Sequence, residues 1–159
     1  MKLLLFIIIL VVIGLYGGYV NGAEGSKFHG TVVAVSDGDT IRVKLDNGQE
    51  LKVRLLGIDT PETHHPTKPV GCYGTEASNF TKKMLSEKEV DLEYDVERYD
   101  KYGRTLAYVY LNGERYNDIL VKNGYAKSLT ILPNKKYSFK LLQLELEAEK
   151  NKVGLWGVC

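Results

Sequence analysis

The segment TIRVKLDNGQELKVRLLGI, residues 40–58, carries the clearest structural pattern in the chain. Apolar residues alternate with polar ones on both sides of Asp46-Asn47-Gly48, as they do in a β-strand with one buried face. Asn-Gly is a strong signal for a tight hairpin, because both residues tolerate a positive φ angle. We therefore predict two half-buried strands, residues 40–45 and 51–58, joined by a short turn.

Further elements are predicted on both sides of this hairpin. Residues 29–35 predict a strand that enters it through the turn at Asp37-Gly38. Beyond a long Pro-rich loop over residues 59–72, apolar residues at helical spacing predict a helix over residues 75–88. Strands follow at 90–96 and 105–111, and Asn117 predicts the start of a short helix that ends at Lys122.

The last part of the chain predicts another helix. After Pro133, the residues Phe139, Leu142, Leu146 and Val153 mark its apolar face, with lysine and glutamate on the exposed face, and it ends near Gly154. With 159 residues the chain has the length of one ordinary domain. The order of elements predicts an α+β domain, mainly β, with a small barrel of strands flanked by helices.

Residues 1–23 have the order of a segment that directs export. An apolar run over residues 3–15, interrupted only by Gly14, follows the charge of Lys2 and precedes small residues that end at Ala23. We predict a signal peptide over 1–23, a folded domain over 24–159, and a secreted or extracytoplasmic location. A retained membrane anchor is the alternative, because the run extended to Val20 approaches the roughly 20 residues that cross a bilayer.

Charge and cysteine content limit how the domain can act. The chain has 21 Lys and Arg against 20 Asp and Glu, and residues 1–23 contribute only Lys2, so the domain is formally neutral. Attraction to nucleic acid must then come from a local patch or from a bound cation. Cys72 and Cys159 both lie in the predicted exported part, where a disulfide is permitted. Two free thiols and binding of a metal are the alternatives.

Three carboxylates follow predicted strands. Asp39, Asp59 and Glu62 stand at the ends of neighbouring strands, where converging oxygens would suit Ca²⁺ or Mg²⁺. Taken alone, Asp37-Gly38-Asp39 is explained better as a hairpin turn with solvated acids, and Asp59 could likewise cap a turn. His64 and His65 have no third nitrogen or sulfur ligand nearby, which favours a solvated position in the loop.

Two arginines accompany these carboxylates. Arg54 interrupts an apolar run, and the alternation of the strand directs its side chain away from the face of Val53 and toward the acidic loop. Arg104 follows Gly103, which permits a turn that aims the side chain inward. A surface salt bridge is the alternative for Arg54. Without a suitable Ser/His or Cys/His pair, this set favours phosphoryl chemistry over acyl transfer.

Four stretches of the sequence resemble the staphylococcal nuclease (thermonuclease) family: Val32 to Thr40, Arg54 to Thr63, Tyr73 to Ser78 and Asp100 to Tyr108. The resemblance runs from about Phe28 to Leu155-Trp156, in the same order and with similar gaps. It implies a five-stranded OB-type barrel with three helices. It also implies an endonuclease that hydrolyses the phosphodiester bonds of DNA or RNA and yields 3′-phosphates.

The resemblance also implies roles for single residues. One Ca²⁺ would be held by the carboxylates of Asp39 and Asp59 and by the backbone carbonyl of Thr60, with Mg²⁺ and Mn²⁺ as alternatives on oxygen chemistry alone. Glu62 would activate the attacking water as the general base, and the phosphate would be held by Arg54 and Arg104. Lys101 and Tyr102 would contact the substrate. We expect a monomer whose partner is DNA or RNA, without a protein partner.

The chain departs from the family at residues 128–134. The family carries two tyrosines there that pack on the nucleotide, whereas this segment reads SLTILPN, is one residue shorter and has no aromatic residue. A catalytically silent nucleic-acid-binding module of the same fold is the alternative function. A silent copy would be expected to have lost part of the charged set, and all of it is present: Asp39, Arg54, Asp59, Glu62 and Arg104.

Overall fold

The computed structural model describes residues 27–159, except residues 65 and 68. The predicted signal peptide or anchor over 1–23 lies outside the described residues, so it stays a prediction. In the part of the chain that the structure describes, no helix combines the length and the apolar character needed to cross a membrane.

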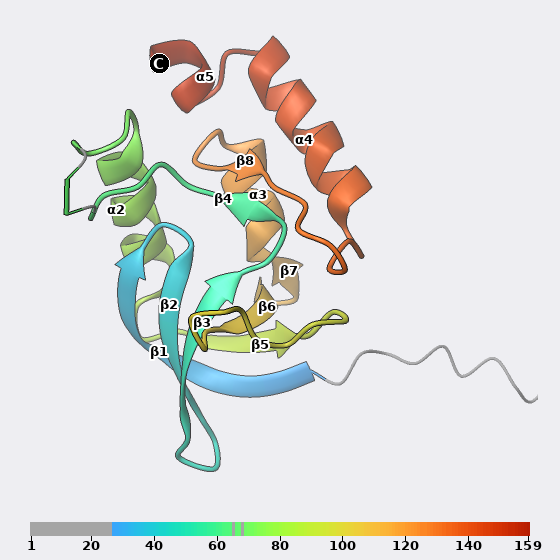
Figure 1. The fold of residues 1–159 in the computed structure, drawn as a ribbon. Helices are drawn as coiled ribbons and strands as arrows, with labels where there is room; N and C mark the ends of the chain where they lie inside the picture. Colours follow the sequence, from blue (N-terminus) through green and yellow to red (C-terminus); the bar gives the residue numbers. More distant parts are fainter. Residues whose placement is uncertain (1–26, 65, 68) are drawn as a thin grey trace, which may run out of the picture.

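Five strands close into a barrel (Figure 1). They are β1 (Lys27–Asp37), β2 (Thr40–Leu45), β3 (Glu50–Leu55), β5 (Glu89–Glu93) and β6 (Thr105–Leu111). Neighbours in the order β3-β2-β1-β5-β6 pair antiparallel, and a parallel pairing of β3 with β6 closes the ring. The predicted class, a mainly β α+β domain built on a five-stranded OB-type barrel, is confirmed.

The long strand β1 makes this closure possible, because it serves two neighbours. Its first half pairs with β5 and most of its length pairs with β2, with register shifts between Val32 and Ala34 and between Val35 and Asp37. Such irregularities bend a strand and increase its twist. Alternate residues of the strands fill the barrel, including Ile41, Val43, Val53, Leu92 and Val109, each at most 1% exposed.

Short strands and helices surround the barrel. β7 (Glu114–Arg115) pairs antiparallel with the end of β6. β4 (Ile58–Asp59) pairs with β8 (Lys127–Ser128) in a separate two-stranded sheet. The helices are α2 (Gly74–Leu85), α3 (Tyr116–Lys122), α4 (Ser138–Lys150) and the four-residue α5 (Leu155–Val158). In Figure 1, α2 lies beside β1 and β2, whereas α3 and α4 lie beyond the sheet of β4 and β8. The three predicted helices are therefore present.

Several predicted boundaries were wrong by a few residues. The strand predicted over 51–58 ends at Leu55, because the chain turns at Gly57, whose φ of +74° favours glycine. A Cβ at Gly57 would also lie 2.5 Å from Leu141 Cδ1, so any other residue at this position would force the Leu141 side chain of α4 to move. The break directs β4 away from the barrel toward β8.

The last helix differs most from its prediction. It ends at Lys150 instead of near Gly154, and α5 is a separate turn after positive φ angles at Lys152 and Gly154. Its buried residues are Leu141, Leu144 and Ala148, whereas Phe139, Leu142 and Leu146 are 74%, 45% and 56% exposed. The sequence carries two apolar stripes on this helix, and packing of α4 against α3 buries the stripe that contains none of the predicted residues.

Candidate active site

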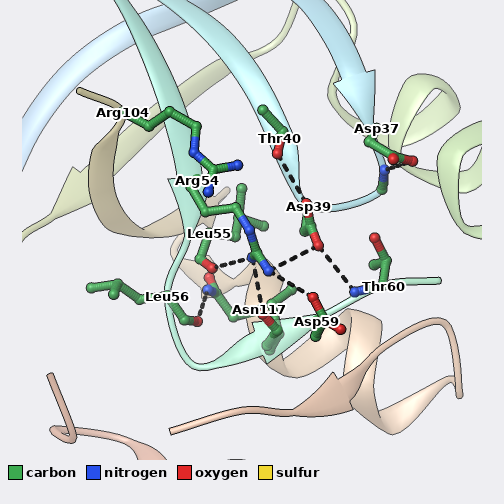
Figure 2. Close-up of polar contacts among 12 residues, drawn as sticks. Asp37, Asp39, Thr40, Arg54, Leu55, Leu56, Asp59, Thr60, Arg104 and Asn117 are labelled. Atoms are coloured by element: carbon green, nitrogen blue, oxygen red, sulfur yellow. Dashed lines mark hydrogen bonds and ion pairs between the residues drawn. The ribbon is translucent and has the colours of Figure 1, made fainter. Parts of the chain in front are cut away.

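Asp39 connects the β1–β2 turn to the loop after β4. It stands directly before β2 and is 7% exposed. Its Oδ1 accepts a hydrogen bond from the Thr40 hydroxyl at 2.9 Å, and its Oδ2 accepts one from the backbone N–H of Thr60 at 3.0 Å (Figure 2). Two segments 21 residues apart are thereby fixed to one buried carboxylate.

Arg54 lies at the centre of the polar contacts (Figure 2). From the penultimate position of β3, its Nη1 donates to the carbonyl oxygens of Leu55 and Ile58 at 2.8 and 2.9 Å. Its Nη2 donates to Asp59 Oδ1 at 2.9 Å and lies 3.2 Å from Asp39 Oδ2. The side chain is 14% exposed. The turn at Gly57 creates this arrangement, because it folds the carbonyls around the guanidinium.

The surroundings of Asp39 and Asp59 fit a hard cation. Both carboxylates contact the same nitrogen of Arg54, so their oxygens converge. Desolvation raises the pKa of Asp59, and the charge of Asp39 adds to this effect although Arg54 opposes it. Thr60 Oγ1 beside them is buried and has no hydrogen-bond partner among the described residues. The site therefore combines surplus negative charge with an unsatisfied oxygen.

The number of protein ligands at this point is small. Within residues 27–159, apart from the two gaps, no group of three or more His, Cys, Asp or Glu side chains is arranged to hold a metal ion. Two carboxylates would therefore need carbonyl and water oxygens to complete a coordination shell, which Ca²⁺ and Mg²⁺ both accept. This donor set excludes a closed zinc site of nitrogen and sulfur ligands at this position.

A polar cleft of about 470 Å³ brings the predicted charged residues together. Its walls include Asp39, Arg54, Asp59, Glu62 and Arg104. Glu62 is exposed to solvent on the loop after β4, and its Oε1 accepts a hydrogen bond from the backbone N–H of His64 at 3.2 Å. A base that must reach a water molecule needs this kind of access.

Arg104 enters the cleft from the end of the connection between β5 and β6. It follows Gly103, whose φ is +76°, and precedes β6. Asp100 holds it twice: Oδ2 accepts from Arg104 Nε at 2.6 Å and Oδ1 accepts from the Arg104 backbone N–H at 2.9 Å. Across the described chain neither Nη atom of Arg104 has a hydrogen-bond partner, so both can bind an anion. Sequence reasoning missed Asp100, whose signal is its four-residue spacing from Arg104.

Asp37 is another functional candidate that the sequence did not single out. Its Oδ1 accepts from the Thr63 hydroxyl at 2.9 Å and from the backbone N–H of Gly38 at 2.8 Å. Its Oδ2 accepts from the Thr63 backbone N–H at 3.2 Å. Because Thr63 follows Glu62, Asp37 fixes the loop that carries Glu62. The sequence interpretation as a solvated turn acid fits only one of these three contacts.

The amino-acid sequence matches known proteins over most of its length. A family model described as staphylococcal nuclease homologue matches residues 52–158. The thermonuclease of Staphylococcus intermedius is 45% identical over 158 residues, which cover 94% of both chains. The thermonuclease of Staphylococcus hyicus is 47% identical over 126 residues, which cover 79% of this chain and 74% of that protein. This chain belongs to the staphylococcal nuclease family.

A further relative comes from another genus. The endonuclease YncB of Bacillus subtilis (strain 168) is 42% identical over 123 residues, which cover 76% of this chain and 58% of that protein. The predicted membership of the staphylococcal nuclease family is thus confirmed.

A cavity of about 400 Å³ lies next to the polar cleft in this member of the staphylococcal nuclease family. Arg54 and Arg104 line both. Lys101 and Tyr102 line the second cavity, and Tyr102 is 70% exposed. Its remaining walls are mainly aliphatic, from Leu55, Leu56, Ile58, Leu106, Leu129 and Ile131, and they also include Gly57, Glu97, Asp100 and Asn134. The segment without aromatic residues therefore contributes Leu129 and Ile131 to the rim of this cavity.

A disulfide lies behind the loop of Glu62. Cys72 and Cys159 are joined with an S–S distance of 2.03 Å across a sequence separation of 87 residues. The bond links the residue before Tyr73 and α2 to the last residue of the chain. On the loop-entropy model, a cross-link of this length stabilises the folded state by about 4 to 5 kcal/mol.

Proposed function

We propose that this protein is an exported, calcium-dependent endonuclease that hydrolyses phosphodiester bonds in DNA or RNA. One observation carries the proposal: Asp39, Arg54, Asp59, Glu62 and Arg104 line a single polar cleft. The set combines a site for a cation, a solvent-accessible carboxylate and two guanidinium groups, which is what attack on an anionic phosphodiester requires. The names of the thermonuclease and endonuclease relatives support the same activity.

Asp39 and Asp59 would hold the ion through their carboxylates, and Thr60 through its backbone carbonyl. When bound, Ca²⁺ would supply positive charge where negative charge accumulates on the phosphate. This local charge also explains how a domain of nearly balanced formal charge can attract a polyanion. Magnesium or manganese in its place is an outcome that the test below distinguishes.

The two arginines contribute differently to the proposed reaction. Arg54 is fixed by two carbonyl oxygens and two carboxylates, so its charge is oriented before the substrate arrives. Arg104 is held through Nε, which leaves its Nη groups to donate to phosphate oxygens and to the departing 5′ oxygen. Glu62 accepts a proton from the attacking water.

The aliphatic cavity beside the cleft would take the nucleotide next to the cleaved bond. Lys101 and Tyr102 contact the sugar or the base, and Leu129 and Ile131 provide an apolar surface in place of aromatic rings. The aliphatic side chains contact every base and offer no hydrogen bonds to its edges, and the Asp100 and Asn134 side chains in the same walls already bond to Arg104 and to the Glu97 carbonyl. We therefore propose cleavage with weak base preference.

Digestion of plasmid, single-stranded DNA and RNA tests the proposed activity. The purified protein is assayed with Ca²⁺, Mg²⁺, Mn²⁺ or a chelator, beside Glu62→Gln and a matched Glu114→Gln variant at the exposed first position of β7. We expect cutting that requires Ca²⁺, a loss of about 10²- to 10⁴-fold in Glu62→Gln because a general base is removed, and no loss in Glu114→Gln. A folded protein that binds nucleic acid but cuts none under any metal is a silent binding module.

Export needs a separate measurement. Expression of the full chain in a bacterial host with a secretory pathway, followed by mass determination, distinguishes removal of residues 1–23 from their retention. A product that starts near Glu24 in the medium supports secretion. A full-length product that sediments with membranes supports the anchor, and a full-length soluble cytoplasmic product contradicts both.

A further inference from the structure

Residues 71–74 form a support behind the backbone of Glu62. The backbone N–H of Gly71 donates to the Glu62 carbonyl oxygen at 2.8 Å. A Cβ at Gly71 would lie 3.0 Å from Pro61 Cβ, and a Cβ at Gly74 would lie 3.0 Å from the Pro61 carbonyl oxygen. The two glycines thus bring this support into direct contact with the peptide units on both sides of Glu62. Its position determines the position of Glu62.

Cys72 lies in the middle of this support and connects it to a fixed point. Its partner Cys159 follows α5, where the Cys159 N–H donates to the Leu155 carbonyl at 2.8 Å. Leu155 is 4% exposed, and its N–H donates to the Gly124 carbonyl at 2.9 Å. The C-terminal turn is therefore packed on the body of the domain. The disulfide therefore connects the support of Glu62 covalently to this packed turn.

The conformation of Tyr73 gives a second, independent sign of constraint. Tyr73 has a φ of 67°, in the left-handed region that a bulky residue seldom adopts. Such a conformation persists only where the surrounding structure enforces it. The disulfide at the preceding residue and the stacking of Tyr73 on Tyr125, with ring centroids 5.5 Å apart, both act on this position.

Glu62 is consequently held from two sides. Asp37 holds Thr63 from the β1–β2 turn by hydrogen bonds. The support at 71–74 holds Pro61 and Glu62 from the opposite side and depends on Cys72. A general base must keep its distance to the attacking water, and a displacement of about 1 Å can reduce a rate by about 100-fold.

We propose that the Cys72–Cys159 disulfide is a positioning element for Glu62, so that the rate of cutting depends on the redox state of this bond. The inference rests on the proposed nuclease function. Reduction by a thiol or a phosphine breaks the S–S bond with two electrons and two protons and yields two thiols. The freed support can then move away from the Glu62 backbone, while the barrel and the cation site remain as they are.

Kinetics of the full chain test this proposal. Wild type and Cys159→Ala are assayed with and without a phosphine reductant, at a temperature where each form is folded by circular dichroism. We expect Cys159→Ala and reduced wild type to lose about tenfold in kcat, with KM and the half-saturating calcium concentration within about twofold, because only the base is displaced. The reductant should not change Cys159→Ala further.

A stability control separates positioning from general destabilisation. Leu144 is buried on α4 and lines neither the polar cleft nor the aliphatic cavity, so Leu144→Ala should lower the melting temperature without moving Glu62. It should retain the kcat of wild type at the same assay temperature. A loss of kcat in Leu144→Ala equal to that in Cys159→Ala, or full kcat in folded Cys159→Ala, overturns the proposal.

Amide hydrogen exchange gives a measurement that needs no activity. The Gly71 N–H is bonded to the Glu62 carbonyl, so its exchange should become at least about tenfold faster on reduction, while Val43 in the barrel stays protected. Unchanged exchange at Gly71 contradicts the positioning role. If oxidised wild type does not cut nucleic acid but Gly71 responds to reduction, the proposed function fails and the disulfide still positions Glu62.

Discussion

The polar cleft and the aliphatic cavity share Arg54 and Arg104 but are built in different ways. In the polar cleft, Asp39 and Arg54 are nearly buried, and each is fixed by several hydrogen bonds. In the aliphatic cavity, Tyr102 and Ile131 are 70% and 65% exposed, and the Tyr102 ring is contacted by the cationic groups of Lys101 and Arg104. Rigidly held charge suits the chemical step, whereas an open apolar rim suits variable nucleotides. The two regions should therefore respond differently to substitution.

The largest effect is expected at Arg54. Arg54→Lys keeps the charge but cannot bridge two carbonyls and two carboxylates, because a lysine ammonium lacks the planar fork of guanidinium. Loss of oriented charge at the phosphate predicts a fall in kcat of about 10²- to 10³-fold. Steady-state kinetics beside Arg42→Lys, a matched change on the exposed side of β2, measure it. Equal rates for the two variants would exclude Arg54 from the chemical step.

A smaller effect is expected at Asp100, which holds Arg104 by two hydrogen bonds. Asp100→Asn keeps the size of the side chain and weakens the charged bond to Arg104 Nε. We expect kcat to fall about tenfold, which is about 1.4 kcal/mol of lost transition-state stabilisation. The effect should disappear in a background that already carries Arg104→Lys. A full additional loss in the double variant would show that Asp100 acts on something other than Arg104.

The sequence predicted the polar cleft well because its parts are short and local. Asp39, Arg54 and Asp59 stand at strand ends whose alternation is clear, and a barrel brings such ends together. Asp37 and Asp100 were missed, because hydrogen bonds to Thr63 and Arg104 distinguish them from turn acids, and only the folded chain shows these bonds. For Asp100, the four-residue spacing from Arg104 was the one available signal. The end of β3 at Leu55 depends on the turn at Gly57, where the Leu141 side chain of α4 approaches the backbone closely.

The aliphatic cavity could not be predicted in the same way. Leu56, Leu106 and Ile131 come from three segments that are far apart in the sequence, and each looks like an ordinary core residue. On α4, two apolar stripes compete, and the prediction selected Phe139, Leu142 and Leu146, which the structure exposes. Tertiary packing determines which stripe is buried, and a single sequence does not show which one that is.

The apolar rim should tolerate an added aromatic ring. Ile131→Tyr places a stacking surface at the cavity, and stacking of a base on an aromatic side chain is worth about 1 to 3 kcal/mol. We expect KM for single-stranded DNA to fall about fivefold or more, with kcat within about twofold. Leu132→Tyr is the matched control, because Leu132 is 70% exposed and does not line the cavity. An equal fall in KM for both variants would indicate that an added tyrosine binds DNA nonspecifically, wherever it lies on this segment.

The smallest effect on cutting is expected at Glu93, a buried carboxylate outside both the cleft and the cavity. Its side chain is 4% exposed and accepts hydrogen bonds from Lys136, Tyr110 and Tyr137. Burial alone would raise the pKa of Glu93, but these hydrogen bonds outweigh burial and lower the pKa below its usual value of 4.5. The stabilisation is therefore present above about pH 4.5 and is lost as the pH falls through the lower pKa of the folded state.

Glu93→Gln should accordingly change stability and leave kcat unchanged. At pH 7 the variant loses charged hydrogen bonds in a buried position, which predicts a fall in the free energy of unfolding of about 1.5 to 3 kcal/mol. The difference from wild type should shrink as the pH falls below 4.5 and through the lower pKa of the folded state, where the native carboxylate becomes protonated. Urea unfolding at pH 7 and pH 3.5 measures this difference. A loss of kcat in the folded variant would show that buried charge affects cutting wherever it lies, and the contrast between the polar cleft and the rest of the barrel would then fail.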